Sequence, residues 1–121
     1  MAPAFVDHCL ELLGAVGAAR ARRMFGGHGL YLDELFVAIV TGDALYLKVD
    51  TLTRARFEAA GARPFVHESA LRRVVLGFWT VPEAAMDSPA AMAPWARLAK
   101  DAAVRARARP AGSARRRGVR A

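Results

Sequence analysis

The chain has 121 residues and a mass of 13.0 kDa, which is room for one domain with a real hydrophobic core. Its hydrophobic fraction of 55% and charged fraction of 24% are typical of globular proteins and exclude wholesale disorder. The net charge of +7 is unevenly distributed. Residues 1–104 hold 11 basic and 11 acidic side chains, whereas residues 105–121 hold seven arginines and no acidic residue. The basic character is therefore a property of the C-terminal end.

The sequence lacks the usual signals for export or membrane insertion. Its apolar runs are far shorter than the roughly 18 residues that a spanning helix needs. The first basic residue is Arg20, so the basic start of a signal peptide is missing. The single cysteine, Cys9, cannot form an intrachain disulfide, which suits a reducing compartment. We therefore expect a cytoplasmic protein with no membrane partner.

The first half of the chain predicts one helix followed by four strands. Apolar residues recur at helical spacing over residues 3–16. A short strand is expected next, then a glycine-rich interruption at residues 26–29 and three further strands. The strand ranges are 22–25, 30–32, 35–41 and 44–49. Gly42-Asp43 fits a two-residue type II′ turn, whereas Asp33-Glu34 is a weaker turn signal because glutamate does not readily adopt positive φ.

The second half predicts a helix, two strands and a final helix. Asp50 is placed to cap a helix that stops at Gly61, and strands are expected over residues 65–67 and 74–81. Ser88-Pro89 begins the last helix. Tight turns between neighbouring strands indicate antiparallel pairing. The sequence thus predicts a two-layer α+β fold of order α-β-β-β-β-α-β-β-α, with about five antiparallel strands and helices on one face.

The strand patterns also indicate how the second face of the sheet is used. In residues 45–49, aliphatic residues alternate with Tyr46 and Lys48, so these two side chains are expected to face water or a partner. Residues 35–40 are apolar on both faces. Part of the face away from the helices must therefore be covered, either from within the chain, which we favour, or by another molecule.

No residue cluster in the sequence indicates catalysis or a cofactor. Residues 24–31 are rich in glycine but match neither nucleotide-binding fingerprint and lead into a strand, so a bend or bulge is the favoured interpretation. His8, His28 and His67 are far apart and lack metal-ligand spacing. Cys9 is interpreted as a core thiol, and a Cys-His nucleophile would require a histidine beside the first helix. We expect no cofactor, metal or catalytic residue.

The two tryptophans and the arginine-rich C-terminal residues are the remaining candidates for a functional role. Trp79 and Trp95 are interpreted as core anchors. The chain is divided into a domain over residues 1–104 and a disordered tail over residues 105–121, because Pro110 interrupts any helix there. The tail either contacts phosphate backbones without reading bases or merely solubilises the protein. Its candidate nucleic-acid contacts are Arg105, Arg107, Arg109, Arg115, Arg116, Arg117 and Arg120.

Several segments, taken in order, resemble the N-terminal domain family of TfoX/Sxy proteins. They include Arg-Met-Phe-Gly-Gly-His-Gly-Leu-Tyr at 23–31, Leu-Tyr-Leu-Lys-Val-Asp at 45–50, Phe-Trp at 78–79 and Val-Pro-Glu at 81–83. The resemblance covers about residues 5–104. The structural motif of this family is carried here by Met24, Phe25, Gly26, Gly27 and Gly29.

The resemblance implies a small bacterial cytoplasmic α+β domain with a fold like that of type III secretion chaperones. It also implies a role in natural competence, through transcription regulated together with a cyclic-AMP receptor protein. Two features depart from the family. An arginine-rich stretch stands where the competence regulators have a second domain, and Asp33-Glu34 replaces the usual Asp-Gly turn. The family supplies no catalytic or ligand residues to transfer.

Three functional hypotheses follow. The first is a non-enzymatic regulatory adaptor whose sheet face, with Tyr31, Tyr46 and Lys48, contacts a transcription factor or a second copy of the chain. The second is a stand-alone nucleic-acid-binding protein that uses the arginine-rich tail. The third, and least favoured, is an enzyme or ligand-binding protein that uses residues 26–29 and His28.

Overall fold

The computed structural model describes residues 3–24, 26–68 and 73–108. It contains three α-helices, one 3₁₀ helix and six strands, in the predicted order. The elements are α1 (Pro3–Leu13), β1 (Ala19–Met24), β2 (Gly27–Leu32), β3 (Leu35–Thr41), β4 (Ala44–Lys48), α2 (Arg54–Ala59), β5 (Pro64–Glu68), β6 (Arg73–Thr80), η1 (Glu83–Asp87) and α3 (Pro89–Ala108).

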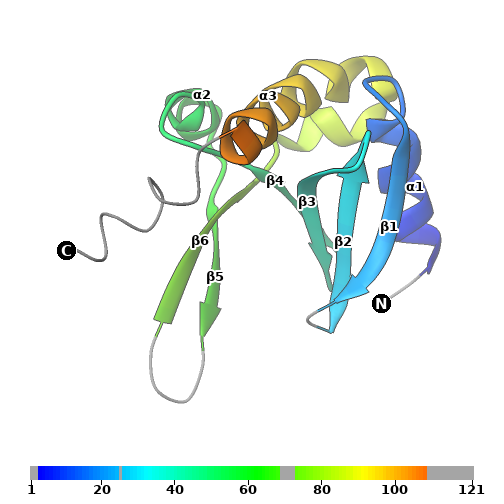
Figure 1. Ribbon diagram of the computed structural model, residues 1–121, viewed down its shortest axis with the longest axis horizontal. Coiled ribbons are helices and arrows are strands. Elements are labelled where there is room, and N and C mark those ends of the chain that lie inside the picture. Colours follow the sequence, from blue (N-terminus) through cyan, green and yellow to red (C-terminus); the bar gives the residue numbers. More distant parts are fainter. Residues whose placement is uncertain (1–2, 25, 69–72, 109–121) are drawn as a thin grey trace.

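The strands form a single antiparallel sheet of order β1-β2-β3-β4-β6-β5. The six strands confirm the α+β prediction, with one strand more than the approximate count. Figure 1 shows that the β5–β6 hairpin diverges from β1, β2 and β3. The register of β2 on β3 shifts between Leu30 and Tyr31, which is a β-bulge. Since bulges bend and twist a strand, this one contributes to the curvature of the sheet.

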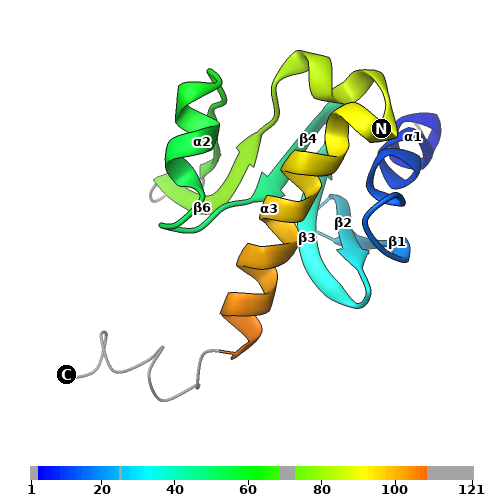
Figure 2. The same cartoon turned by 90° about the horizontal axis from the view of Figure 1, so that it is seen from above.

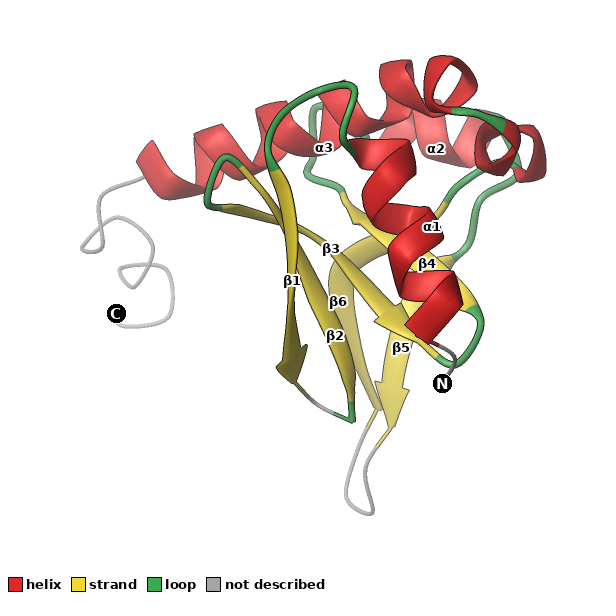
Figure 3. Ribbon diagram, turned by 90° about the vertical axis from the view of Figure 1, so that its right-hand side faces the viewer, coloured by secondary structure: helices red, strands yellow, loops and turns green. Residues whose placement is uncertain are grey.

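The helices cover one face of the sheet and enclose the core. Seen from above, α3 crosses the sheet with α1 on one side and α2 on the other (Figure 2). In Figure 3, the helices form one layer and the strands the other. The core contains fully buried side chains from both layers, such as Leu12, Leu47 and Met92. Trp79 and Trp95 pack against this core, as predicted.

Local sequence signals set the turns and helix ends. Ser88 accepts a hydrogen bond from the backbone N–H of Ala91 (3.1 Å), which confirms it as the cap of α3. Gly42 has φ of 61°, and Asp43 beside it does not have positive φ, so the β3–β4 turn is of the predicted type II′. Asp50 caps the turn before α2, because its Oδ1 accepts from the backbone N–H groups of Leu52 and Thr53.

Several predicted boundaries differ from the structure. The first helix ends at Leu13, short of the predicted residue 16, and α2 begins only at Arg54. β1 begins at Ala19 and β2 at Gly27, so Gly27, His28 and Gly29 extend a strand rather than interrupt it. The 3₁₀ helix η1 has no counterpart in the prediction.

The final helix extends beyond residue 104, where the sequence predicted the end of the domain. α3 continues to Ala108, and both Arg105 and Arg107 lie on it. The remaining arginines of the predicted tail lie outside the described residues. Within the described part of the chain, no helix combines the length and apolar character that crossing a membrane would require.

Candidate interaction surface

The face of the sheet opposite the helices carries a row of aromatic and basic side chains. Tyr31 lies opposite Phe36 in the β2–β3 pair, and Lys48 lies opposite Phe78 in the β4–β6 pair. Tyr46 shares the face with Lys48, because alternate residues of a strand point the same way. The predicted set of Tyr31, Tyr46 and Lys48 therefore lies on one face. We call this face of the sheet, opposite the helices, the outward face.

The rings on the outward face pack against one another. The centroids of Tyr31 and Phe36 are 5.3 Å apart, as are those of Phe36 and Phe78. The guanidinium of Arg20 lies 4.9 Å from the Tyr31 ring centroid, and the ammonium of Lys48 lies 5.2 Å from that of Phe78. In these contacts, neighbouring side chains occupy the ring faces that would otherwise stack on nucleic-acid bases. The arrangement thus favours a self-covered protein surface over a base-stacking platform.

This packing explains how β3, whose residues are apolar on both faces, is covered on the outward face. Ile39 lies opposite Tyr46 on the outward face, yet it is only 5% exposed. Tyr46 in turn packs on Phe65 of β5, with ring centroids 4.9 Å apart. Cover from within the chain, the favoured alternative, is therefore present. The sequence pattern did not identify Phe36, Phe65 and Phe78 as its source, because the strand register was not known.

A hollow of about 290 Å³ lies where the outward face meets the end of α3. Tyr31, Phe36 and Lys48 line it from the sheet, and Arg107 lines it from the helix. Two groups of residues predicted separately, one on the sheet face and one in the tail, thus meet at one place. Tyr46 lies outside this hollow.

The β2–β3 turn is held by an unexpected set of polar contacts. Asp33 and Glu34 both have positive φ, 49° and 69°, as in a type I′ turn. Arg20 makes two hydrogen bonds to the Glu34 carboxylate (2.6 and 2.8 Å), and Arg107 donates to the Glu34 carbonyl oxygen (3.1 Å). Lys100 bonds the Asp33 carboxylate at 2.7 Å. These ion pairs lower the pKa of both carboxyls, chiefly through hydrogen bonds from Lys100 and Arg20 respectively.

A second ion pair joins α3 to the segment before α2. The Arg105 guanidinium bonds both oxygens of the Asp50 carboxylate, at 2.7 and 3.0 Å. The Arg105 guanidinium holds the pKa of that carboxyl below its usual range, and the backbone donors of Leu52 and Thr53 lower it further. Arg105 is therefore committed to a contact within the fold.

We expect Asp50→Asn to destabilise the protein by about 1 kcal/mol at neutral pH. The asparagine oxygen still caps the turn, but the ion pair with Arg105 is lost. Because folding lowers the pKa of Asp50, its charged contacts stabilise the fold fully above about pH 4 and are lost as the pH falls through the folded pKa. The difference between variant and parent in urea unfolding should therefore shrink on acidification. Asp43→Asn, on an exposed turn, is the control; equal effects would contradict this role.

Comparison with known proteins assigns the chain to a family. Residues 11–103 match the TfoX N-terminal domain family. The chain belongs to this family. One relative, the DNA transformation protein TfoX1 of Aliivibrio fischeri, is 30% identical over 77 residues. That match covers 64% of this chain and 37% of the relative, so the chain spans little more than a third of that protein.

The glycine motif of the TfoX N-terminal domain has a structural role here. A Cβ on Gly27 would overlap the carbonyl oxygen of Val40, and one on Gly29 would lie 2.6 Å from Cε of Met24. Gly26 has φ of 73° at the β1–β2 turn. The predicted bend is confirmed at Gly26. Gly27 and Gly29 instead allow close packing within the sheet, and Phe25 lies outside the described residues.

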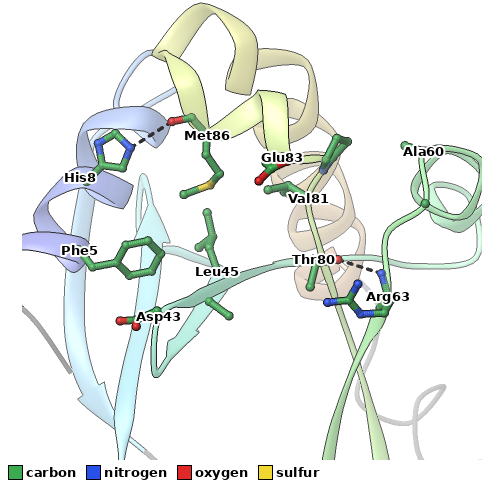
Figure 4. Close-up of a pocket in the computed structure, with 13 residues that line it drawn as sticks. Phe5, His8, Asp43, Leu45, Ala60, Arg63, Thr80, Val81, Glu83 and Met86 are labelled. Carbon is green, nitrogen blue, oxygen red and sulfur yellow. Dashed lines mark hydrogen bonds between the residues drawn. The ribbon is translucent and has the colours of Figure 1, made fainter.

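Another cavity of this TfoX-family domain, about 680 Å³, lies between α1, the β3–β4 turn, η1 and the segment that precedes β5. Figure 4 shows Phe5, Leu45 and Met86 on one side of it and Arg63 with Thr80 on the other. His8 bonds the Met86 carbonyl (3.1 Å). All the polar side chains that line the cavity are exposed or half-buried. They lack the desolvation that usually accompanies catalytic groups.

The remaining candidates for chemistry are dispersed. Cys9 is fully buried, and burial raises the pKa of its thiol to about 12, so it stays protonated at neutral pH. His28 lines a separate hollow beside α1, and the side chain of His67 lies outside the described part. Among the described residues, no three histidine, cysteine or carboxylate side chains cluster as metal ligands would. Arg109, Arg115, Arg116, Arg117 and Arg120 lie outside the described residues.

Proposed function

We propose that this chain is a non-enzymatic adaptor domain in competence-type regulation, which contacts a protein partner through the outward face. Its membership of the TfoX N-terminal domain family and its TfoX1 relative support the regulatory role. The observation that carries the contact surface is the meeting of Tyr31, Phe36, Lys48 and Arg107 at one hollow. Mixed aromatic and basic surfaces of this kind are typical of protein interfaces.

The charges of this surface support a choice of partner. Lys48 and Arg107 lie at the hollow, and the carboxylate of Glu34 is engaged by Arg20. The surface therefore favours an acidic region of a partner protein. The family resemblance suggests a cyclic-AMP receptor protein as that partner.

The test measures binding of the purified cyclic-AMP receptor protein to the full chain. We expect the double variant Tyr46→Ala, Lys48→Glu to weaken binding about tenfold or more, since it removes one aromatic contact and reverses one charge. Arg56→Glu on α2 changes the charge equally, away from this face, and should leave binding unchanged. Unaltered binding by the double variant, or no binding by the parent, would refute the proposed contact.

The alternative is a nucleic-acid-binding protein that uses the C-terminal arginines. Arg105 is engaged with Asp50 and Arg107 with the Glu34 carbonyl, which leaves Arg109, Arg115, Arg116, Arg117 and Arg120 as the main candidates. If these five contact duplex DNA, log K should fall with log salt concentration at a slope of about −4.5. This alternative would be favoured if the chain binds DNA but not the receptor protein. DNA binding should then be abolished in the triple variant Arg115→Gln, Arg116→Gln, Arg117→Gln.

A further inference from the structure

The first strand forms one edge of the sheet, and no other strand of the described residues pairs with its outer side. β1 is the outermost strand, next to β2 (Figure 3). Within the described residues, backbone hydrogen bonds join residues 19–24 to β2 alone. Its outer N–H and C=O groups are therefore available to a further strand.

The two sides of this edge differ in chemistry. Arg20 and Arg22 lie opposite Tyr31 and Gly29, so they point to the outward face. Arg22 is exposed and forms no ion pair within the described part of the chain. β1 contains three arginines and no acidic residue. Arg20 is already paired with the Glu34 carboxylate, and Arg23 lies on the helix-facing side, so an added strand would meet chiefly the charge of Arg22 on its outward side.

The helix-facing side of the edge is hollowed and has a mixed lining. A cavity of about 560 Å³ lies between α1 and β1. Its apolar lining comes from Val6, Leu10 and Ala21, and its polar lining from Asp7, Arg23 and His28. The small side chain of Ala21 leaves room there for a side chain from a neighbouring strand. Every second residue of an added strand would point into this hollow.

We propose that the β1 edge binds an extended acidic segment of another protein by strand addition. Main-chain hydrogen bonds would provide the affinity, and the alternation of apolar and acidic side chains would provide the specificity. Apolar residues would enter the hollow beside Leu10 and Ala21, and acidic residues would meet Arg22. This surface is separate from Tyr46 and Lys48, so the inference goes beyond the adaptor contact proposed above.

Two other occupants fit less well. A second copy pairing through its own β1 would place arginines against arginines, and like charges across a strand pair are destabilising. A nucleic acid has no peptide groups to continue the hydrogen-bond ladder of the sheet. The arginines of β1 would also repel a basic strand, so an acidic strand is preferred.

The test uses a fluorescent peptide of alternating glutamate and valine, about eight residues long, and the full chain. We expect saturable binding by fluorescence polarisation and slower hydrogen exchange of the β1 amides. Arg22→Glu should weaken binding about tenfold or more, and a lysine-valine peptide should recover binding to that variant. Arg56→Glu is the matched control, and Arg22→Gln replaces Arg22→Glu if the latter does not fold.

Defined outcomes would overturn this inference. The inference fails if the glutamate-valine peptide does not bind, or if Arg22→Glu and Arg56→Glu weaken its binding equally. It also fails if N-methylation of alternate peptide amides leaves the binding undiminished. Self-association that Arg22→Glu alters, without peptide binding, would indicate a second copy instead. Loss of binding in Arg22→Glu but not in the double variant Tyr46→Ala, Lys48→Glu would separate this site from the contact proposed at Tyr46 and Lys48.

Discussion

Replacing Phe57 with alanine is expected to lower the free energy of unfolding by about 3–5 kcal/mol. Phe57 is 0% exposed, is the one buried residue of α2, and meets Trp95 of α3 edge-on with ring centroids 5.1 Å apart. A helix of six residues has little stability of its own, so α2 depends on this anchor. The loss approaches the whole stability of a small domain. Urea unfolding followed by circular dichroism measures it.

Phe65→Ala is the matched control for Phe57→Ala. Phe65 is a half-buried ring on β5 that packs on Tyr46 of the outward face. Its removal should cost less, about 1–2 kcal/mol, because less apolar surface is lost from the folded state. Similar losses for the two variants would show that α2 is not held mainly by Phe57.

Gly27→Ala is expected to lower the free energy of unfolding by about 1–3 kcal/mol. The new Cβ would overlap the carbonyl oxygen of Val40, which is backbone and cannot rotate away. β2 and β3 must then separate locally, and the same two strands position Tyr31 and Phe36 on the outward face. Chemical denaturation gives the stability loss, and the near-ultraviolet circular dichroism of the aromatic residues reports the disturbance of the face.

Gly26→Ala distinguishes steric overlap from backbone strain. Gly26 has φ of 73°, but a Cβ there would meet no atom within 4 Å. Only the cost of a left-handed conformation applies, about 1 kcal/mol. If Gly27→Ala is no more destabilising than Gly26→Ala, the close approach of Val40 does not explain the glycine motif.

The outward face and the glycine motif are structurally linked. Gly29 gives Met24 and Phe36 room on this face, and Phe36 in turn connects Tyr31 with Phe78. The motif that indicated the family therefore supports the packing of the candidate interaction surface.

Local signals predicted those parts of the fold that depend on neighbours in the chain. The cap at Ser88 and the turn at Gly42 were predicted because each rests on the conformational preferences of one or two residues. Asp50 was predicted to cap the helix itself, whereas it holds the turn before it and the N-cap of α2 is Thr53. The ends of α1, β1 and β2 were not, because packing against other elements decided them. The candidate residues Tyr46 and Lys48 came from strand alternation, which requires no knowledge of the sheet order.

The sequence by itself determined the order of helices and strands, the antiparallel pairing and the family, because hydrophobic periodicity, turn residues and motifs are written along the chain. Only the tertiary structure decided what covers the outward face, which arginines are engaged and which edge is left open. Phe36 meets Phe78, and Arg105 meets Asp50, across long separations in sequence. The physical reason is that such contacts depend on strand register and sheet curvature, which arise only when all the elements pack together.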